Sequence, residues 1–123
     1  MKPNTFDGSI TFCNTEDLEA THHFYHDILE LQLALDAGKC RIYRIREGAF
    51  IGFCTLRNEK PEGIVLTMIT ENVDEWFEKL SNKGVIFEKE PGLYEEFNIY
   101  SCFFRDPNGY LLEIQRFEDP FEM

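Results

Sequence analysis

One carboxylate stands inside an apolar run near the C-terminus of this 123-residue chain. The run 110–114 reads Tyr-Leu-Leu-Glu-Ile, and it follows Asp-Pro-Asn-Gly, which is typical of a tight turn between antiparallel strands. Burying an unpaired carboxylate is costly, so Glu113 needs either solvent or a partner. Strand alternation places Leu112 and Ile114 on one face and Leu111 and Glu113 on the other. Whether that second face borders a cavity or solvent is left open by the sequence.

Histidine and cysteine are the other residues that could do chemistry. His22 and His26 have the i,i+4 spacing of a helical metal pair, with His23 beside them. No acidic base lies between them as in zinc proteases, so solvent-facing histidines are the favoured interpretation. The four cysteines show no CxxC spacing, which predicts free buried thiols rather than disulfides or a zinc site.

Charge and hydropathy limit the class of protein. The net charge is −11, of which residues 61–123 carry −9 and residues 1–60 carry −2. Such a surface repels phosphate backbones, so we expect no nucleic-acid partner. The acidity either attracts cationic small molecules or serves solubility alone. No apolar run is long enough to cross a membrane and the N-terminus has no apolar signal region, so we expect no membrane partner and a cytoplasmic location.

The elements that must position Glu113 form two similar sets. The first has a strand at 10–14, a helix that begins at Thr15 or Asp17, and strands near 31–36, 40–46 and 49–56, with Gly38 and Gly48 in the turns. The second has a strand at 64–69, a helix closed by Gly84, and strands near 85–89, 99–105 and 110–116.

A duplication accounts for this similarity. Thr-Glu-Asn-Val-Asp at 70–74 repeats Thr-Glu-Asp-Leu-Glu at 15–19, a lag of 55 residues. We therefore predict an α+β fold of two tandem βαβββ modules in a single domain, 1–123. Module one covers about 8–57, a linker 58–63, module two about 64–117 and a C-terminal tail 118–123. Their sheets are expected to curl around a cavity, with the helices outside.

The chain resembles the vicinal oxygen chelate superfamily, which includes glyoxalase I, extradiol dioxygenases and bleomycin-resistance proteins. The resemblance rests on 17–29, on the second helix ending in Lys-Gly-Val at 83–85, and on Phe-Arg-Asp-Pro-Asn-Gly-Tyr-Leu-Leu-Glu at 104–113. Glu30 departs from it, because the family usually has Gly after its first helix. The resemblance implies a homodimer.

The resemblance also implies four pseudo-symmetric positions for metal ligands. Counting from the two helices and the two Gly turns places them at Ile10, Gly52, Val65 and Glu113. Only Glu113 can bind a metal, and a divalent site of this type needs three or four protein ligands. We therefore predict no metal and no other cofactor.

The leading hypothesis is metal-independent binding of a small organic molecule, cationic or hydrogen-bonding, as in the antibiotic-binding proteins of the family. The alternative is a metal-dependent lyase, isomerase or dioxygenase of the same superfamily, with Glu113 as a ligand to a divalent metal; catalytic residues are unknown, and whether the chain is an enzyme is left open. The residues expected to line the ligand site are Ile10, Phe12, Gly52, Val65, Leu111, Glu113, Tyr94 and Phe97. Tyr94 and Phe97 belong to segment 90–98, which we interpret as an irregular loop that is either a lid over the pocket or a segment docked on the core or a dimer interface.

Overall fold

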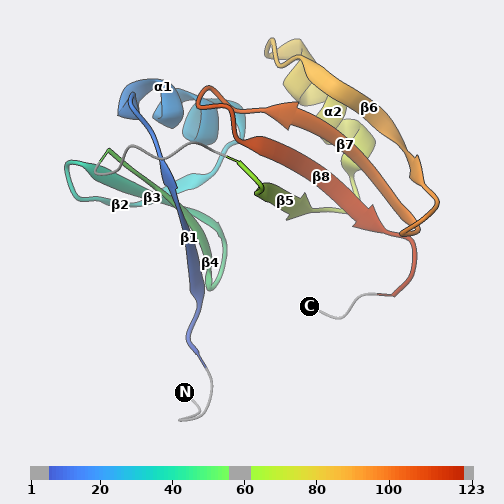
Figure 1. Cartoon of the computed structure of the whole chain (residues 1–123), viewed down its shortest axis with the longest axis horizontal. Coiled ribbons are helices and arrows are strands. Elements are labelled where there is room, and N and C mark those ends of the chain that lie inside the picture. Colours follow the sequence, from blue (N-terminus) through green and yellow to red (C-terminus); the bar gives the residue numbers. More distant parts are fainter. Residues whose placement is uncertain (1–5, 56–61, 121–123) are drawn as a thin grey trace. The chain divides into compact units, whose positions relative to one another are not determined.

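The computed structural model describes residues 6–55 and 62–120 of the chain. The chain forms two compact units, Met1–Pro61 and Glu62–Met123, and each contains one four-stranded sheet (Figure 1). The predicted linker at 58–63 and tail at 118–123 lie partly outside the described residues. The α+β class and the two tandem βαβββ modules are confirmed, and neither sheet is closed. The predicted single domain stays a prediction.

The first unit has the strand order β1-β4-β3-β2. β1 is parallel to β4, and the other neighbours are antiparallel. Gly38 and Gly48 adopt positive φ in the two turns, where a side chain would be strained. The elements are β1 (Ser9–Asn14), α1 (Leu18–His22), η1 (His23–Ile28), β2 (Gln32–Asp36), β3 (Cys40–Arg46) and β4 (Ala49–Cys54).

The first helix changes its winding part-way along. Asp17 is the N-cap, and its carboxylate accepts from the Ala20 amide at 3.0 Å. From His23 the helix is a π-helix, in which the Leu29 amide donates to the Phe24 carbonyl, five residues back, at 2.9 Å. Glu30 then takes φ +64°, so it occupies the left-handed turn in which the sequence lacked the expected glycine.

The second unit repeats this topology with the order β5-β8-β7-β6. Its helix begins after Asn72, and Gly84 follows its C-cap with φ +93°, as predicted. The elements are β5 (Val65–Ile69), α2 (Val73–Asn82), β6 (Phe87–Tyr94), β7 (Ile99–Arg105) and β8 (Leu111–Phe117).

The prediction of an irregular loop at 90–98 is wrong. β6 runs through Pro91 and Gly92 to Tyr94, pairs with β7, and is joined to it by a short turn at 95–98. β6 is an outer strand of its sheet, where a missing amide is tolerated, and its pairing with β7 shifts register on both sides of Lys89. Tyr94 therefore lies at the end of a paired strand, and only Phe97 lies in the turn.

Each unit has its own core. Tyr25, Tyr43 and Phe53 are fully buried in the first unit. In the second, α2 packs against β7 and β8 and buries Leu80 with Leu112. Among the described residues, no helix is both long enough and apolar enough to span a membrane.

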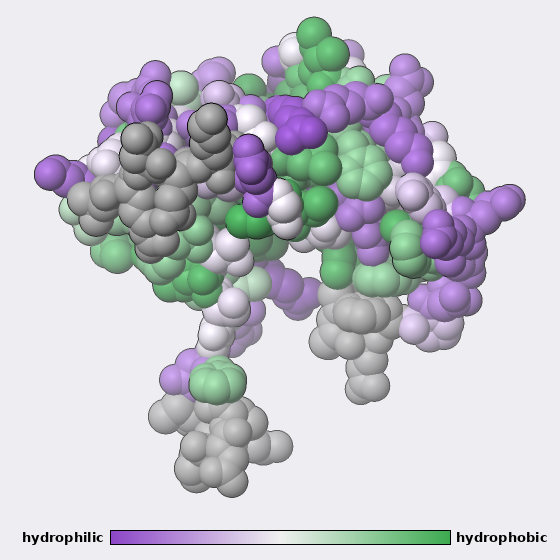
Figure 2. Space-filling model, in the orientation of Figure 1, coloured by the Kyte–Doolittle hydropathy of each residue, from purple (hydrophilic) through white to green (hydrophobic). Residues whose placement is uncertain are grey.

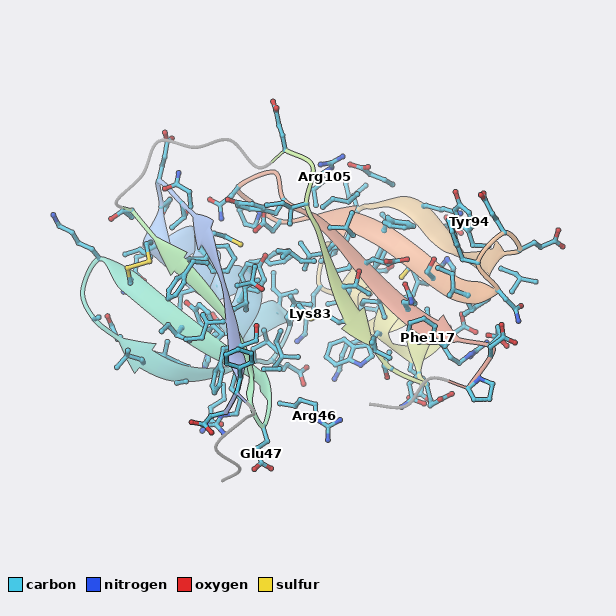
Figure 3. The ribbon with its side chains drawn as sticks, turned by 60° about the horizontal axis from the view of Figure 1, so that its bottom comes forward. Arg46, Glu47, Lys83, Tyr94, Arg105 and Phe117 are labelled. Carbon is cyan, nitrogen blue, oxygen red and sulfur yellow. A yellow bond between two sulfur atoms is a disulfide. The ribbon has the colours of Figure 1, made fainter. Side chains whose placement is uncertain are left out.

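The expectation that the cysteines are all free thiols is wrong. Cys40 and Cys54 are register partners on β3 and β4 and form a disulfide, drawn in yellow in Figure 3. Cys13 and Cys102 are buried and do not form a disulfide. Spacing along the chain did not reveal the pair, because their proximity depends on the register of two strands.

Candidate functional site

Glu113 lies on β8, and the two faces of that strand have different neighbours. Leu112 and Ile114 are buried on one face, 0% and 2% exposed. Glu113 points to the opposite face, as alternation predicts, yet it is only 7% exposed. The choice that the sequence left open is therefore decided: Glu113 borders a pocket rather than open solvent.

The pocket lies within the second unit and has a volume of about 520 Å³. Figure 2 shows hydrophobic residues gathered over β7 and β8 on the face in view, and Figure 3 shows Tyr94 on β6 and Phe117 at the end of β8. The walls of the pocket are mostly apolar and include four aromatic rings, and two polar side chains, Glu113 and Gln115, also line the pocket. The lining residues are Val65, Tyr94, Phe97, Ile99, Phe103, Glu113, Gln115 and Phe117. This volume and this lining suit a small organic molecule.

Two neighbouring side chains hold the Glu113 carboxylate. Thr67 is its register partner on β5, and the Thr67 hydroxyl donates to Oε1 at 2.9 Å. With the Gln115 amide turned so that its nitrogen faces Glu113, that nitrogen lies 3.0 Å from each carboxylate oxygen. A carboxylate has about four lone-pair sites, so these two donors leave acceptor capacity for a third group.

Tyr94 and Phe97 form one wall of the pocket. Their ring centroids lie 5.5 Å apart, and the Lys89 ammonium lies 4.4 Å from the centroid of Tyr94. An ammonium group is attracted to the negative face of an aromatic ring, and Lys89 occupies one face of the Tyr94 ring in this way.

The sequence matches a known protein family, and the match covers most of the chain. Residues 9–114 match the sequence profile of the Glyoxalase/Bleomycin resistance protein/Dioxygenase superfamily. The chain belongs to this superfamily. The recognition made from the motifs is thereby confirmed. A search of curated proteins finds no match.

Several solved structures share the fold of this chain. Lactoylglutathione lyase from Agrobacterium tumefaciens aligns with TM-score 0.73 and 20% identity over 94% of this chain and 96% of its own. A glyoxalase/bleomycin resistance protein/dioxygenase from Nocardioides aligns with TM-score 0.77 and 19% identity, over 100% of this chain and 92% of its own. An integron cassette protein from the mobile metagenome of a Halifax Harbour sewage outfall aligns with TM-score 0.77 and 21% identity, over 89% of this chain and 97% of its own. Identities this low support the fold alone.

The residues of this superfamily member do not fit a metal centre at Glu113. Ile10, Gly52 and Val65, the other three implied positions, carry no donor side chain. Within the described residues, the group of His, Cys, Asp and Glu side chains with closely spaced ligand atoms is His22, His26 and Asp27, which does not include Glu113.

The predicted site residues divide between the two units. Val65, Tyr94, Phe97 and Glu113 line the same pocket, whereas Leu111, on the same face of β8 as Glu113, is not among its lining residues. The remaining three belong to the first unit. There Phe12 and Gly52 are register partners, and a Cβ at Gly52 would lie 2.7 Å from Cε1 of the Phe12 ring, so Phe12 fills the space beside the glycine. Ile10, on β1, is 43% exposed. Their part in ligand binding stays a prediction.

Cys102 is not a nucleophile for this pocket. It is fully buried, and Cys102 and Phe104 alternate along β7 with the pocket residues Ile99 and Phe103. Burial raises the pKa of the Cys102 thiol to about 11, so the thiolate is disfavoured near neutral pH.

Sequence reasoning missed the residues that hold or complete the site. Thr67, Gln115, Phe103 and Phe117 were not among the predicted residues. Gln115 follows Glu113 by two residues and so shares its face of the strand; this polar pair in an apolar strand was the available signal. Thr67 had no such signal, because its contact depends on how β5 and β8 pair.

Proposed function

We propose that this protein binds a small organic molecule carrying a cationic nitrogen, without a metal, in the pocket of its second unit. The observation that carries the proposal is Glu113, a carboxylate only 7% exposed in a pocket otherwise lined mainly by aliphatic and aromatic side chains. A charge in such a place favours a ligand that brings the opposite charge.

The surroundings of Glu113 support a nitrogen cation in particular. Thr67 and Gln115 orient the carboxylate and leave it able to accept from a ligand N–H, in a charge-assisted hydrogen bond. Phe97 and Phe103 line the same pocket and offer aromatic rings to the cation. The net charge of −9 in residues 61–123 attracts cations towards this unit.

A matched pair of probes tests this proposal. 2-Phenylethylamine is cationic at pH 7 and 2-phenylethanol is neutral, while their shapes are nearly the same. We expect the amine to bind the wild type at least tenfold more tightly than the alcohol in calorimetric titrations. Glu113→Gln should reduce that ratio to near one.

Glu90→Gln is the control, because Glu90 is exposed on β6 and its replacement changes the net charge equally. An equal loss of preference in both variants would assign the effect to the general field of the protein and contradict the proposal. Binding of neither probe, followed by failure of a wider set of amines, would also contradict it. A stoichiometric divalent ion at Glu113 in the untagged protein would support the metal-dependent alternative instead.

The homodimer and the cytoplasmic location stay predictions. Light scattering during size-exclusion chromatography measures the first, and fractionation of cells that express the protein measures the second.

A further inference from the structure

The register of the second sheet gives the pocket two different ends. Thr67, Glu113 and Phe103 are partners on one row across β5, β8 and β7. Tyr94 and Phe117 share a second row, because both are paired with the same residue of β7. That row lies four residues farther along β8, a distance of about 13 Å. A ligand that reaches both rows therefore carries its nitrogen at one end of an apolar body.

The hydrogen bonds to Glu113 use its two oxygens unequally. Oε1 accepts from the Thr67 hydroxyl at 2.9 Å and lies 3.0 Å from the Gln115 nitrogen. Among the described residues, Oε2 has the Gln115 nitrogen alone, also at 3.0 Å. A carboxylate has about four lone-pair sites, two on each oxygen, so Oε1 is filled and Oε2 keeps one. The carboxylate thus offers a single acceptor position to a ligand.

The neighbouring side chains that line the pocket supply no second acceptor within the described part of the chain. Val65, on the same strand as Thr67, and Phe103 carry no polar side-chain atom. When the Gln115 amide turns its nitrogen to Glu113, its oxygen faces a donor of the protein. Glu113 is only 7% exposed, so water reaches little of it. A second ligand N–H would therefore lose its water here without gaining a partner, which is costly for a charged group.

We propose that the pocket selects a tertiary ammonium group at one end of an apolar body, a selectivity that rests on the cation binding proposed above. Such a group has one N–H, which donates to Oε2 of Glu113, and three carbon substituents, which lie against Val65 and Phe103. A primary ammonium leaves two N–H groups unpaired, and a quaternary ammonium makes no hydrogen bond to the carboxylate. Phe103 favours methyl groups on the nitrogen, because an aromatic ring attracts alkylated ammonium groups.

A series of four cations tests this selectivity. 2-Phenylethylamine and its N-methyl, N,N-dimethyl and N,N,N-trimethyl derivatives share one apolar body and are all positively charged at pH 7. In calorimetric titrations we expect the dimethyl compound to bind about tenfold more tightly than the primary and the quaternary compounds. Burial of methyl groups alone would give a different order, since each added methyl group increases the apolar area and the quaternary compound would bind most tightly.

Thr67→Val changes the number of acceptor positions without removing the carboxylate. Loss of the hydroxyl frees a lone pair on Oε1, so a second ligand N–H finds an acceptor. We expect the tightest binding to move from the dimethyl to the monomethyl compound in this variant. Ser101→Ala is the matched control: it removes a buried hydroxyl on β7 that has no hydrogen-bond partner among the described residues, and the order of affinities should stay that of the wild type. Circular dichroism spectra check the folding of both variants.

Several outcomes would overturn the selectivity and leave the binding of cations at Glu113 intact. These are a quaternary compound that binds as tightly as the tertiary one, a primary amine that binds most tightly, and an order of affinities that is the same in Thr67→Val and in the wild type. If Thr67→Val does not fold, the order in the wild type decides alone. If none of the four cations binds, both the selectivity and the proposed function are wrong.

Discussion

Replacing Thr67 with Val removes one hydroxyl that holds the Glu113 carboxylate and keeps the shape of the side chain. A hydrogen bond to a charged group contributes about 1.5–3 kcal/mol. Thr67 is exposed while Glu113 is 7% exposed, so water replaces part of what the hydroxyl supplied. We therefore expect Thr67→Val to lower the free energy of unfolding by about 1.5–2 kcal/mol, at the lower end of that range.

The measurement is a urea titration followed by tryptophan fluorescence. The chain has a single tryptophan, Trp76, and it lies on α2 in the same unit as Thr67, so its emission reports on that unit. In a Glu113→Gln background the acceptor is neutral, and neutral hydrogen bonds are roughly half as strong. The cost of Thr67→Val should therefore fall by about half there.

Ser101→Ala is the matched control for this measurement. Ser101 is fully buried on β7, and its hydroxyl has no hydrogen-bond partner among the described residues. Its removal should change the free energy of unfolding by less than about 0.5 kcal/mol or raise it slightly. If Thr67→Val costs no more than Ser101→Ala, or costs the same with Gln at 113, the contact does not hold the carboxylate and our account of the site is wrong.

Four further predictions follow from other contacts. Reducing the Cys40–Cys54 disulfide should lower the stability of the first unit by about 3 kcal/mol, since it closes a loop with a sequence separation of 14; a Cys40→Ser, Cys54→Ser double variant should match the reduced protein and be insensitive to reductant. Glu30→Gly should raise the free energy of unfolding by about 1 kcal/mol, because glycine adopts φ +64° without strain; an unchanged denaturation midpoint would contradict this. The raised pKa of Cys102 means that the folded protein keeps the thiol proton longer than the unfolded chain, so stability should fall as the pH rises from about 9 towards about 11; Cys102→Ala should lose that part of the fall in denaturant titrations at each pH. Phe97 is 64% exposed at the pocket, so Phe97→Ala should leave stability within about 0.5 kcal/mol while weakening amine binding, and a large loss of stability would show that the ring supports the core instead.

The fold was predictable because local signals agreed with the tertiary structure. The glycines at 38, 48 and 84 all take the positive φ that their turns or helix end require. The repeat of the Thr-Glu-Asx motif then fixed the order of elements in the second unit. Pro91 misled the prediction of β6, because proline disfavours a central strand and the sequence does not show that this strand is an outer one.

The site was only partly predictable. Alternation from Leu112 placed Glu113 on the correct face, and the duplication identified Val65 as a neighbour on β5. Thr67, which makes the hydrogen bond, lies two residues farther along β5, and only the parallel pairing with β8 determines that contact. The disulfide was missed for the same reason, since a register between strands is a non-local property.

Pro91 and the irregular pairing around Lys89 also affect how this protein behaves in concentrated solution. An uncovered outer strand presents free amides and carbonyls on which another chain can add a strand and begin an aggregate. Proline removes one amide donor, lysine adds charge, and the two register shifts interrupt the straight ladder that an added strand would need. The features that made this segment resemble a loop in the sequence are thus the same ones that protect β6 from aggregation by strand addition.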